Sequence, residues 1–249
     1  MPLSLGAQGR SRRRGHYASP VTEVQLPATE QGLYLLHEGI GRLEKALPPP
    51  RDFRTIIFGS ARVKRDDPHY RDAYELAQKL AERGIEIVTG GGPGIMEAAN
   101  RGAHESGPKH GHIMSWGVCI DSVYGRIEPP NAYLSRAYQH GNFFTRLHQF
   151  ARLGASGAFV VLPGGIGTLL ELAIIWQLLQ VGHLKNCPLI VADPMWHDVV
   201  DTVRQHAVPR GYVRDEEIER NVVLVSSARE ALPIILDAHG RFKKMRAAG

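Results

Sequence analysis

The stretch VVLPGGIGTLLEL, residues 160–172, combines an apolar run, a cluster of glycines and a segment of helix-forming residues. This order predicts a buried strand, a tight turn after Pro163 and a helix. Unpaired N–H groups at the start of a helix attract anions, and glycine lets an anion approach the backbone closely. The turn is therefore either an ordinary strand-to-helix connection or a phosphate site with the carboxylate of Glu171 beside it.

Short Val- and Ile-rich runs alternate with amphipathic segments on both sides of this stretch. We expect strands within 55–60, 85–92, 112–120, 158–163, 188–193 and 221–226. We expect helices over 69–84, 94–107, 139–154, 168–182, 196–206 and 228–238, and an irregular segment over 121–135. Pro233 either kinks the last helix or marks its first turn. The alternation predicts an α/β fold, a Rossmann-like, doubly wound and mostly parallel sheet with helices on both faces.

The two ends of the chain differ in composition from its middle. Residues 1–29 are rich in Arg, Ser, Gly and Pro and predict a disordered basic tail. Leucine and isoleucine recur at helical spacing over 32–47 until three prolines follow, which predicts a leading helix packed on the domain. We therefore expect one nucleotide-binding domain over 30–239 and a second basic tail over 240–249.

Most of the positive charge lies at the two ends. The formal net charge is +5, and the segments before Thr22 and from Gly240 on contain eight arginines and lysines and no carboxylate, so the body is mildly acidic. Because nucleic-acid-binding domains cluster basic residues on a folded surface, we expect no nucleic-acid partner for the domain. Two distant cysteines, and the lack of a membrane-length apolar run or a signal sequence, predict a cytoplasmic protein without membrane attachment.

Two more glycine clusters stand where predicted strands end, FGSAR at 58–62 and TGGGPGIMEAA at 89–99. Ligands of doubly wound sheets bind at this edge, so three such loops indicate an anion site more strongly than one. None of the loops carries the lysine of a P-loop or the acidic residue of a dinucleotide site, so we expect a ligand with one phosphate. The expected contact residues are Gly59, Ser60, Gly91, Gly92, Gly94, Met96, Gly164, Gly165, Gly167 and Thr168.

Other polar residues have ordinary interpretations beside functional ones. Glu171, expected in the first turn of its helix, either stabilises the helix dipole or contacts a ribose hydroxyl or an attacking water. Arg146 lies next to the apolar stripe of its helix, and spacing alone indicates a surface charge. His104, His110 and His112 lack the spacing of a zinc site, so we expect no metal and no cofactor.

Two of these motifs resemble those of the Lonely Guy (LOG) family of nucleoside 5′-monophosphate phosphoribohydrolases, often labelled lysine decarboxylases. GGGPGIMEAANRGA at 90–103 resembles the first glycine motif of the family, and PGGIGTLLE at 163–171 fits P-G-G-x-G-T-x-x-E at every fixed position. The resemblance covers residues 55–225. It implies a Rossmann-like domain, usually dimeric, that cleaves the N-glycosidic bond of a nucleoside monophosphate to release a free base and ribose 5-phosphate.

The resemblance also implies the roles of two residues. The catalytic glutamate of the family falls on Glu171, and its catalytic arginine falls on Arg146 through the match of FFTRLHQFAR to F-F-x-R-K. The carboxylate would stabilise an oxocarbenium-like ribose or activate water, and the guanidinium would be an electrostatic partner. Leu147 stands where the family has lysine, and the segment between Arg152 and the glycine loop is slightly longer than in the plant enzymes.

Two functions remain open at this point. The first is hydrolysis of a nucleoside 5′-monophosphate, of cytokinin type or a general purine or pyrimidine nucleotide, by a homodimer or higher homo-oligomer. The second is non-catalytic binding or transport of a nucleotide or a phosphorylated cofactor, as in the molybdenum-cofactor carriers that share this fold. Leu147 keeps the second function open, whereas the presence of both Glu171 and Arg146 favours the first.

Overall fold

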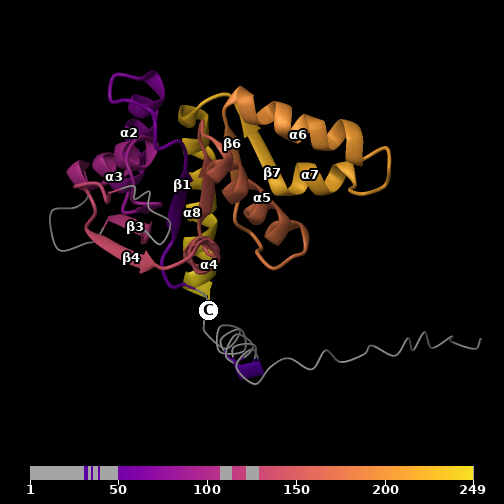
Figure 1. Cartoon of the computed structure of the whole chain (residues 1–249), viewed down its shortest axis with the longest axis horizontal. Helices are drawn as coiled ribbons and strands as arrows, with labels where there is room; N and C mark the ends of the chain where they lie inside the picture. The colour runs from indigo at the N-terminus through magenta and orange to yellow at the C-terminus, as the bar shows by residue number, and fades with distance from the viewer. Residues whose placement is uncertain are drawn as a thin grey trace, which may run out of the picture. The chain divides into compact units, whose positions relative to one another are not determined.

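The computed structural model describes residues 31–32, 35, 39, 50–106, 114–121 and 129–248 (Figure 1). The chain divides into two compact units, Met1–Pro48 and Pro49–Gly249. The predicted N-terminal tail and most of the predicted leading helix lie outside the described residues. The few described residues before Pro48 are helical.

The second unit is built on a sheet in which every described pairing of strands is parallel. Its strands are β1 (Arg54–Phe58), β2 (Glu86–Thr89), β3 (Ser115–Ile120), β4 (Arg136–His140), β5 (Ala158–Val161), β6 (Leu189–Ala192) and β7 (Val222–Val225). Their order across the sheet is β4-β3-β2-β1-β5-β6-β7. The chain therefore extends the sheet from β1 to β4 and then returns to the other side of β1. Ligands of such sheets bind at the carboxyl ends of the strands where the order reverses, here between β1 and β5.

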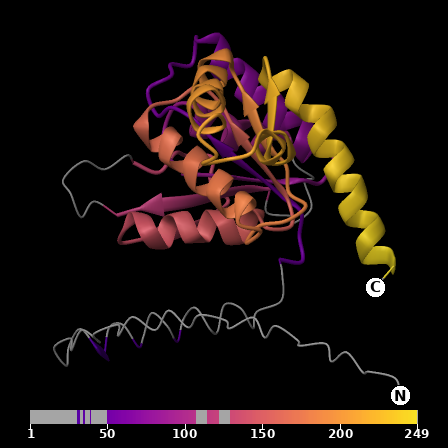
Figure 2. The same ribbon diagram turned by 90° about the vertical axis from the view of Figure 1, so that its right-hand side faces the viewer.

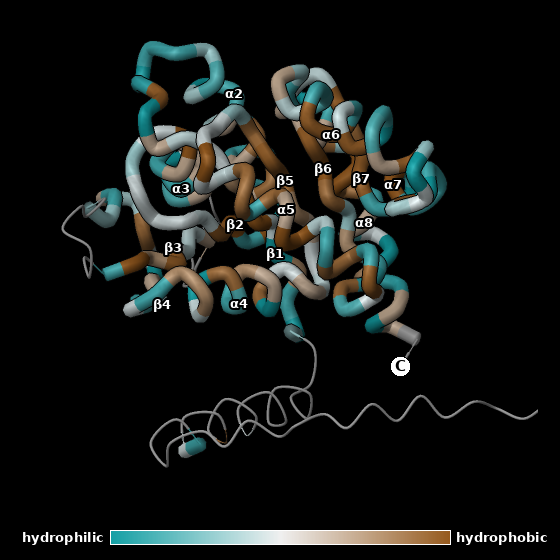
Figure 3. The backbone as a smooth tube through the Cα atoms, turned by 45° about the vertical axis from the view of Figure 1, so that its right-hand side comes forward, coloured by the Kyte–Doolittle hydropathy of each residue, from teal (hydrophilic) through white to brown (hydrophobic). Residues whose placement is uncertain are grey.

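Helices cover both faces of the sheet (Figures 1 and 2). They are α2 (Pro68–Ala81), α3 (Ile95–Ser106), α4 (Phe143–Gly154), α5 (Ile166–Gln180), α6 (Pro194–Ala207), α7 (Asp215–Asn221) and α8 (Ala228–Ala248). α2, α3 and α8 contribute to the apolar core on one face, and α4 to α7 contribute to the core on the other. In β1, Ile57 belongs to the first core and its neighbours Ile56 and Phe58 to the second. A strand buried on both faces requires an unbroken apolar run, which Figure 3 shows along the central strands.

The predicted fold class is confirmed, but the prediction missed β4 and α7. β4 occupies residues 136–138, which the sequence assigns to no element, and residues 139–140, the predicted start of a helix. Its residues, RAYQH, are mostly exposed at the edge of the sheet, so no apolar run marks the strand. α7 is a short helix of seven residues that the apolar spacing did not reveal.

The last helix is longer than predicted. α8 continues to Ala248 through the four basic residues for which the sequence predicts a tail. Pro233 lies inside this helix. Phe242 packs on Phe53 with the ring centroids 5.7 Å apart, which ties the basic segment to the start of the sheet. No helix among the described residues, α8 included, has the length and apolar content needed to cross a membrane.

Candidate functional site

Three glycine loops meet at Ser60, at the carboxyl ends of β1, β2 and β5. The Ser60 amide donates to the carbonyl oxygen of Pro163 at 2.9 Å, and the Ser60 carbonyl oxygen accepts from the Ile95 amide at 2.9 Å. Ser60, in the loop that follows β1, thus joins the loop that precedes α3 to the loop that precedes α5. The structure brings the three predicted loops together at the reversal of strand order.

Two of the glycines are required by contacts between these loops. Gly94 has a φ of +70°, and a Cβ there would overlap the Ser60 carbonyl oxygen. A Cβ on Gly59 would overlap the side chain of Ile95. Gly94 thus lets the backbones of two loops approach closely, and Gly59 leaves room for the side chain of Ile95.

The loop before α5 is open toward solvent. Gly164 has to be glycine because a Cβ would overlap Oγ1 of Thr168, which is buried. Gly165 and Gly167 are exposed, and no described atom lies within 4 Å of the position that a Cβ would take. Gly165 is also the N-cap of α5 and gives the helix no side-chain cap. The first N–H groups of α5 are therefore accessible to an anion.

Arg146 is buried, with 9% of its surface exposed, so the surface interpretation drawn from helical spacing is wrong. Its Nε donates to the carbonyl oxygen of Val118 at 2.8 Å, and its Nη2 donates to that of Gly90 at 3.3 Å. A Cβ on Gly90 would overlap this guanidinium and would lie 2.6 Å from Sδ of the buried Met96. The glycine thus leaves room for a permanent positive charge beside the loop that follows β2.

Glu171 is half-buried on α5. The helix begins at Ile166, two residues earlier than predicted, so Glu171 does not lie in its first turn. The interpretation of Glu171 as a dipole-stabilising residue loses its support, because that effect is confined to the first turn. α5 and α4, which carries Arg146, pack next to each other on one face of the sheet. The two predicted catalytic residues therefore come from adjacent helices that begin at the edge formed by the glycine loops.

His140, at the end of β4, lies close to the charge of Arg146, a neighbour that the sequence did not indicate. Its Nδ1 lies 3.1 Å from Oγ1 of Thr145, and its Nε2 is buried without a hydrogen-bond partner in the described structure. Burial lowers the pKa of His140, and the nearby charges of Arg146 and His148 lower it further. Near pH 7 its imidazole is therefore neutral and does not compete with Arg146 for an anion.

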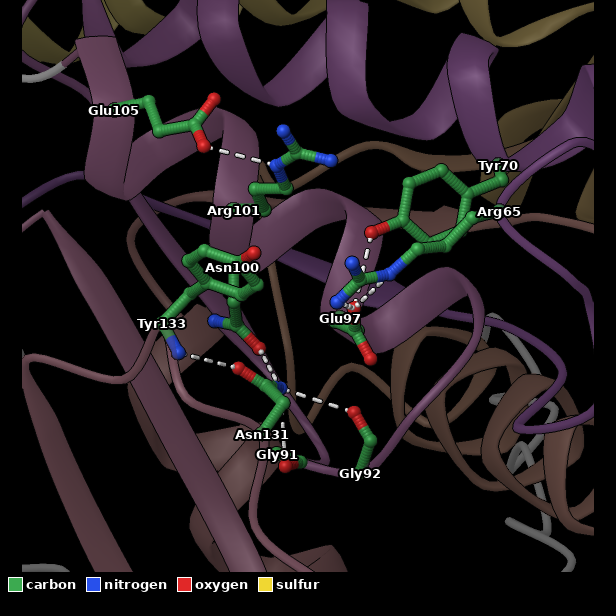
Figure 4. A network of polar contacts seen from close by, with 10 residues as sticks. All are labelled: Arg65, Tyr70, Gly91, Gly92, Glu97, Asn100, Arg101, Glu105, Asn131 and Tyr133. Carbon is green, nitrogen blue, oxygen red and sulfur yellow. Dashed lines mark hydrogen bonds and ion pairs between the residues drawn. The ribbon is translucent and has the colours of Figure 1, made fainter.

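A buried polar network fastens the loop after β2 (Figure 4). Nδ2 of Asn131 lies 3.0 Å and 2.9 Å from the carbonyl oxygens of Gly91 and Gly92, and 3.0 Å from Oδ1 of Asn100. Asn100 has no exposed surface and comes from the otherwise apolar face of α3. An asparagine within an apolar helical stripe is the sequence signal that could have revealed this network.

The loop after β1 is fastened to α3 by Glu97. Its Oε1 accepts from Nε of Arg65 at 2.8 Å and from the hydroxyl of Tyr70 at 3.2 Å (Figure 4). Arg65 and Glu97 also form an ion pair. These contacts fix the outer rim of the site on the side of β1.

Two of the three histidines in the 104–112 cluster are not among the residues that the structure describes. His110 and His112 lie outside the described residues. Within the described ranges, no group of three or more His, Cys, Asp or Glu residues is arranged to hold a metal ion.

The sequence matches two family models. Residues 96–235 match the model described as "Possible lysine decarboxylase", and residues 54–116 match the "SLOG cluster4 family".

Curated relatives cover most of the chain. "Probable cytokinin riboside 5'-monophosphate phosphoribohydrolase LOGL5" of Oryza sativa subsp. japonica is 34% identical over 182 residues, or 72% of this chain and 70% of that protein. "Cytokinin riboside 5'-monophosphate phosphoribohydrolase LOG" of the same plant is 31% identical, over 72% and 71% of the two chains. The LOG7 protein of Arabidopsis thaliana is 29% identical, over 70% and 76%.

Solved structures share the fold at lower identity. The structure of TM1055 has a TM-score of 0.53 and 24% identity, and the match covers 74% of this chain and 99% of that one. The molybdenum cofactor carrier protein of Chlamydomonas reinhardtii has a TM-score of 0.51 and 16% identity, over 76% and 99% of the two chains. At these identities the likeness concerns the fold alone.

Proposed function

Since the chain belongs to the LOG family, we propose that it is a phosphoribohydrolase that cleaves a nucleoside 5′-monophosphate into a free base and ribose 5-phosphate. The observation that carries the proposal is the burial of Arg146 at the carboxyl edge of the sheet. Its hydrogen bonds to described residues both go to backbone carbonyls, of Val118 and Gly90. A buried guanidinium is stabilised by an anionic partner, and a nucleotide would supply one.

The phosphate of the substrate is assigned to the loop before α5. The exposed Gly165 and Gly167 and the uncapped start of the helix support this assignment, because they leave backbone N–H groups free for the anion. The other residues assigned to the phosphate are Gly164 and Thr168. The ribose side is assigned to Gly59, Ser60, Gly91, Gly92, Gly94 and Met96.

The chemistry requires a carboxylate near the ribose and a cation near the leaving group. Water attacks C1′ while the bond from C1′ to the base nitrogen breaks. The electron pair of the broken bond leaves with the base. Glu171 stabilises the positive charge that builds on the ribose, or takes the proton of the attacking water. Arg146 stabilises the negative charge of the departing base or of the phosphate, because a guanidinium is too weak an acid to donate a proton. The proton lost by water ends on the released base.

The identity of the base is proposed from the relatives. They are named for cytokinin riboside 5′-monophosphates, so an isopentenyl-adenine nucleotide is the first substrate to test. Adenosine monophosphate and other purine and pyrimidine nucleotides complete the panel.

The proposed enzyme is a homodimer that associates through α4 and α5. Four large apolar side chains are exposed on these two helices and a fifth at the C-cap of α5, and α5 itself has apolar residues on all sides. They are Phe143, Phe144, Ile166, Leu170 and Val181. An apolar surface of this kind on adjacent helices is typical of an interface between subunits.

A carrier of a nucleotide or phosphorylated cofactor is the alternative, and one residue favours it. Leu147 stands in place of the family's lysine and is buried. Because a leucine side chain is uncharged, the site lacks the second cation that a lysine would supply. Both functions require binding of a nucleotide, and only turnover separates them.

The deciding experiment measures release of ribose 5-phosphate from the nucleotide panel by the wild type and by Glu171→Gln. We expect turnover of at least one substrate, and a loss of about 10²–10⁴-fold in kcat for Glu171→Gln with binding retained. Glu219→Gln, an exposed position on α7, is the matched control and should match the wild type. Binding of a nucleotide without cleavage of any would refute the hydrolase and favour the carrier.

A further inference from the structure

The carbonyl oxygens of three successive glycines after β2 all accept hydrogen bonds from other parts of the chain, and Figure 4 shows Gly91 and Gly92. Arg146 donates to Gly90 at 3.3 Å. Asn131 donates to Gly91 through its backbone amide at 2.8 Å and its side chain at 3.0 Å, and to Gly92 at 2.9 Å. A carbonyl oxygen is the negative end of a peptide dipole, so an unpaired one that faced a bound phosphate would repel it. In the loop after β2, these three carbonyl oxygens are bonded to other protein groups, so they are not unpaired toward a bound phosphate.

The side chain of Asn131 uses both its donors and its acceptor. Its amino group also lies 3.0 Å from Oδ1 of Asn100, and its own Oδ1 accepts from the Tyr133 amide at 3.1 Å. A primary amide offers two donors and an acceptor on a short side chain, whereas a carboxylate of the same size offers no donor. The position therefore selects asparagine over aspartate.

Asn100 connects this arrangement to the core of the sheet. Its Oδ1 accepts from Oγ1 of Thr89 at 2.5 Å, and its Nδ2 donates to Oγ of Ser115 at 2.9 Å and to the Trp116 carbonyl at 3.1 Å. Oγ1 of Thr89 accepts in turn from the Gly91 amide at 2.9 Å. The N–H group and the carbonyl group of one glycine are thus both fixed by the same network.

The segment 131–135, which we call the strap, also packs on the loop. A Cβ on Gly117 in the middle of β3 would lie 2.8 Å from Cδ1 of Leu134, so this glycine makes room for the leucine. The same methyl group would lie 3.4 Å from a Cβ on Gly91. The Ser135 amide donates to the Ser115 carbonyl at 2.9 Å, which fixes the far end of the strap.

We propose that Asn131 is a positioning residue of the nucleotide site, which holds the loop after β2 in the one conformation that accepts the substrate. The inference rests on the proposed function for the identity of the ligand. Gly91 has a φ of +78°, one of several conformations that glycine adopts easily, so the backbone alone does not fix the loop. Without Asn131 the loop samples other conformations, and binding must first order it.

The first test is hydrogen exchange of the backbone amides of residues 90–96 in the ligand-free protein. Asn131→Asp keeps the size of the side chain and removes both donors, so exchange in this segment should accelerate about tenfold or more. Asn221→Asp is the matched control, because Asn221 is also buried but lies at the opposite edge of the sheet, before β7. Exchange over 90–96 that matches this control would overturn the proposal.

The second test uses the affinity for adenosine monophosphate, measured by calorimetry. We expect Asn131→Asp to raise the Kd about tenfold near pH 8, and KM to rise more than kcat falls. As the pH falls toward about 5.5 the new carboxyl group, surrounded by carbonyl oxygens, takes up a proton and regains one donor. The ratio of its Kd to that of the wild type should therefore decrease with pH, which a uniform folding defect would not produce. A ratio near one throughout would overturn the proposal.

Asn131→Ala separates positioning from folding. It removes the same donors without adding a titratable group, so we expect faster exchange and weaker binding with no recovery at low pH. If Asn131→Asp does not fold, exchange of 90–96 in Asn131→Ala decides the question, and wild-type exchange there would contradict us. If the wild type binds nucleotides but cleaves none, the proposed hydrolase function is refuted, whereas the positioning role of Asn131 is not. Active wild type with unchanged exchange in both variants would refute the positioning role alone.

Discussion

The guanidinium of Arg146 exchanges its hydration for two backbone carbonyls and the face of an aromatic ring. Its Cζ atom lies 5.4 Å from the centre of the Phe150 ring, its Nε bonds to Val118 within β3, and its Nη2 bonds to Gly90 just after β2. The cation is therefore held in a fixed orientation by groups that do not neutralise it. A planar guanidinium suits this position because its donors diverge at fixed angles, which an ammonium group does not reproduce.

We predict that Arg146→Lys lowers kcat/KM about 10²–10³-fold, because the charge is kept while one of the two carbonyl bonds and the fixed orientation are lost. Arg146→Gln removes the charge as well and is expected to be slower still. The measurement is the rate of ribose 5-phosphate release from the best nucleotide of the panel. Arg152→Lys, an exposed position on the same helix, should remain within about twofold of the wild type. An unaltered kcat/KM for Arg146→Lys would show that orientation of the cation is unimportant.

At this scale the sequence predicts residue types better than their surroundings. Helical spacing does not place Arg146, because it lies at the border of the apolar stripe that contains Phe150. Asn131 and Asn100 come into contact only after β2, β3 and α3 are assembled, so no local sequence pattern predicts their hydrogen bond. His140 was missed for another reason, since the sequence places it in a helix over 139–154 whereas it ends β4.

The glycines in the loops at the edge of the sheet have two different roles, close packing and access for a ligand. A side chain at Gly94 would meet the backbone of the loop after β1, and a side chain at Gly59 would meet the side chain of Ile95. Gly165 and Gly167 face open space and contribute access, not packing. Substitutions at Gly94 and Gly59 should therefore lower mainly the free energy of unfolding, and substitutions at Gly165 and Gly167 should weaken mainly ligand binding.

We predict that Gly94→Ala lowers the free energy of unfolding by about 2–4 kcal/mol, since alanine is strained at positive φ and its Cβ meets the Ser60 carbonyl. Gly167→Ala is the matched comparison in the helical turn that follows the third loop. It should raise the free energy of unfolding by about 0.5 kcal/mol, because alanine favours the helix, while weakening nucleotide binding. Urea denaturation and calorimetry measure the two effects. Equal stability of Gly94→Ala and the wild type would show that the loops do not depend on this contact.

Element prediction succeeded where burial on both faces produced an apolar run, as in β1, β5 and β6. It failed at β4, which is paired on one side only and has polar residues on its open surface. It also placed the end of α8 too early, because the basic residues there extend the helix along the surface, where Phe242 packs on Phe53 and Arg246 donates to the Arg51 carbonyl. In the loop before α5 only Gly164 has a steric cause, the side chain of Thr168, whereas nothing lies within 4 Å of a Cβ on Gly165 or Gly167.

For the whole molecule, the distribution of exposed apolar side chains differs between the two faces of the sheet. α4 and α5 begin at the edge that carries the glycine loops, and their exposed residues include Phe144, Ile166 and Leu170, which are 85%, 82% and 45% accessible. α8, on the other face, exposes Met245 among charged residues. Association through α4 and α5 would therefore bury apolar surface close to the candidate site.

We predict that the wild type sediments as a dimer at micromolar concentration and that Leu170→Glu shifts it toward monomer, because a carboxylate would have to be buried at the interface. Met245→Glu places the same charge on the opposite face and should leave the dimer intact. Sedimentation velocity over a range of concentrations measures both. If the wild type is a monomer, or if Met245→Glu dissociates it as readily as Leu170→Glu, the face formed by α4 and α5 is not the interface. If Leu170→Glu is monomeric and folded, its rate of ribose 5-phosphate release shows whether catalysis depends on the dimer.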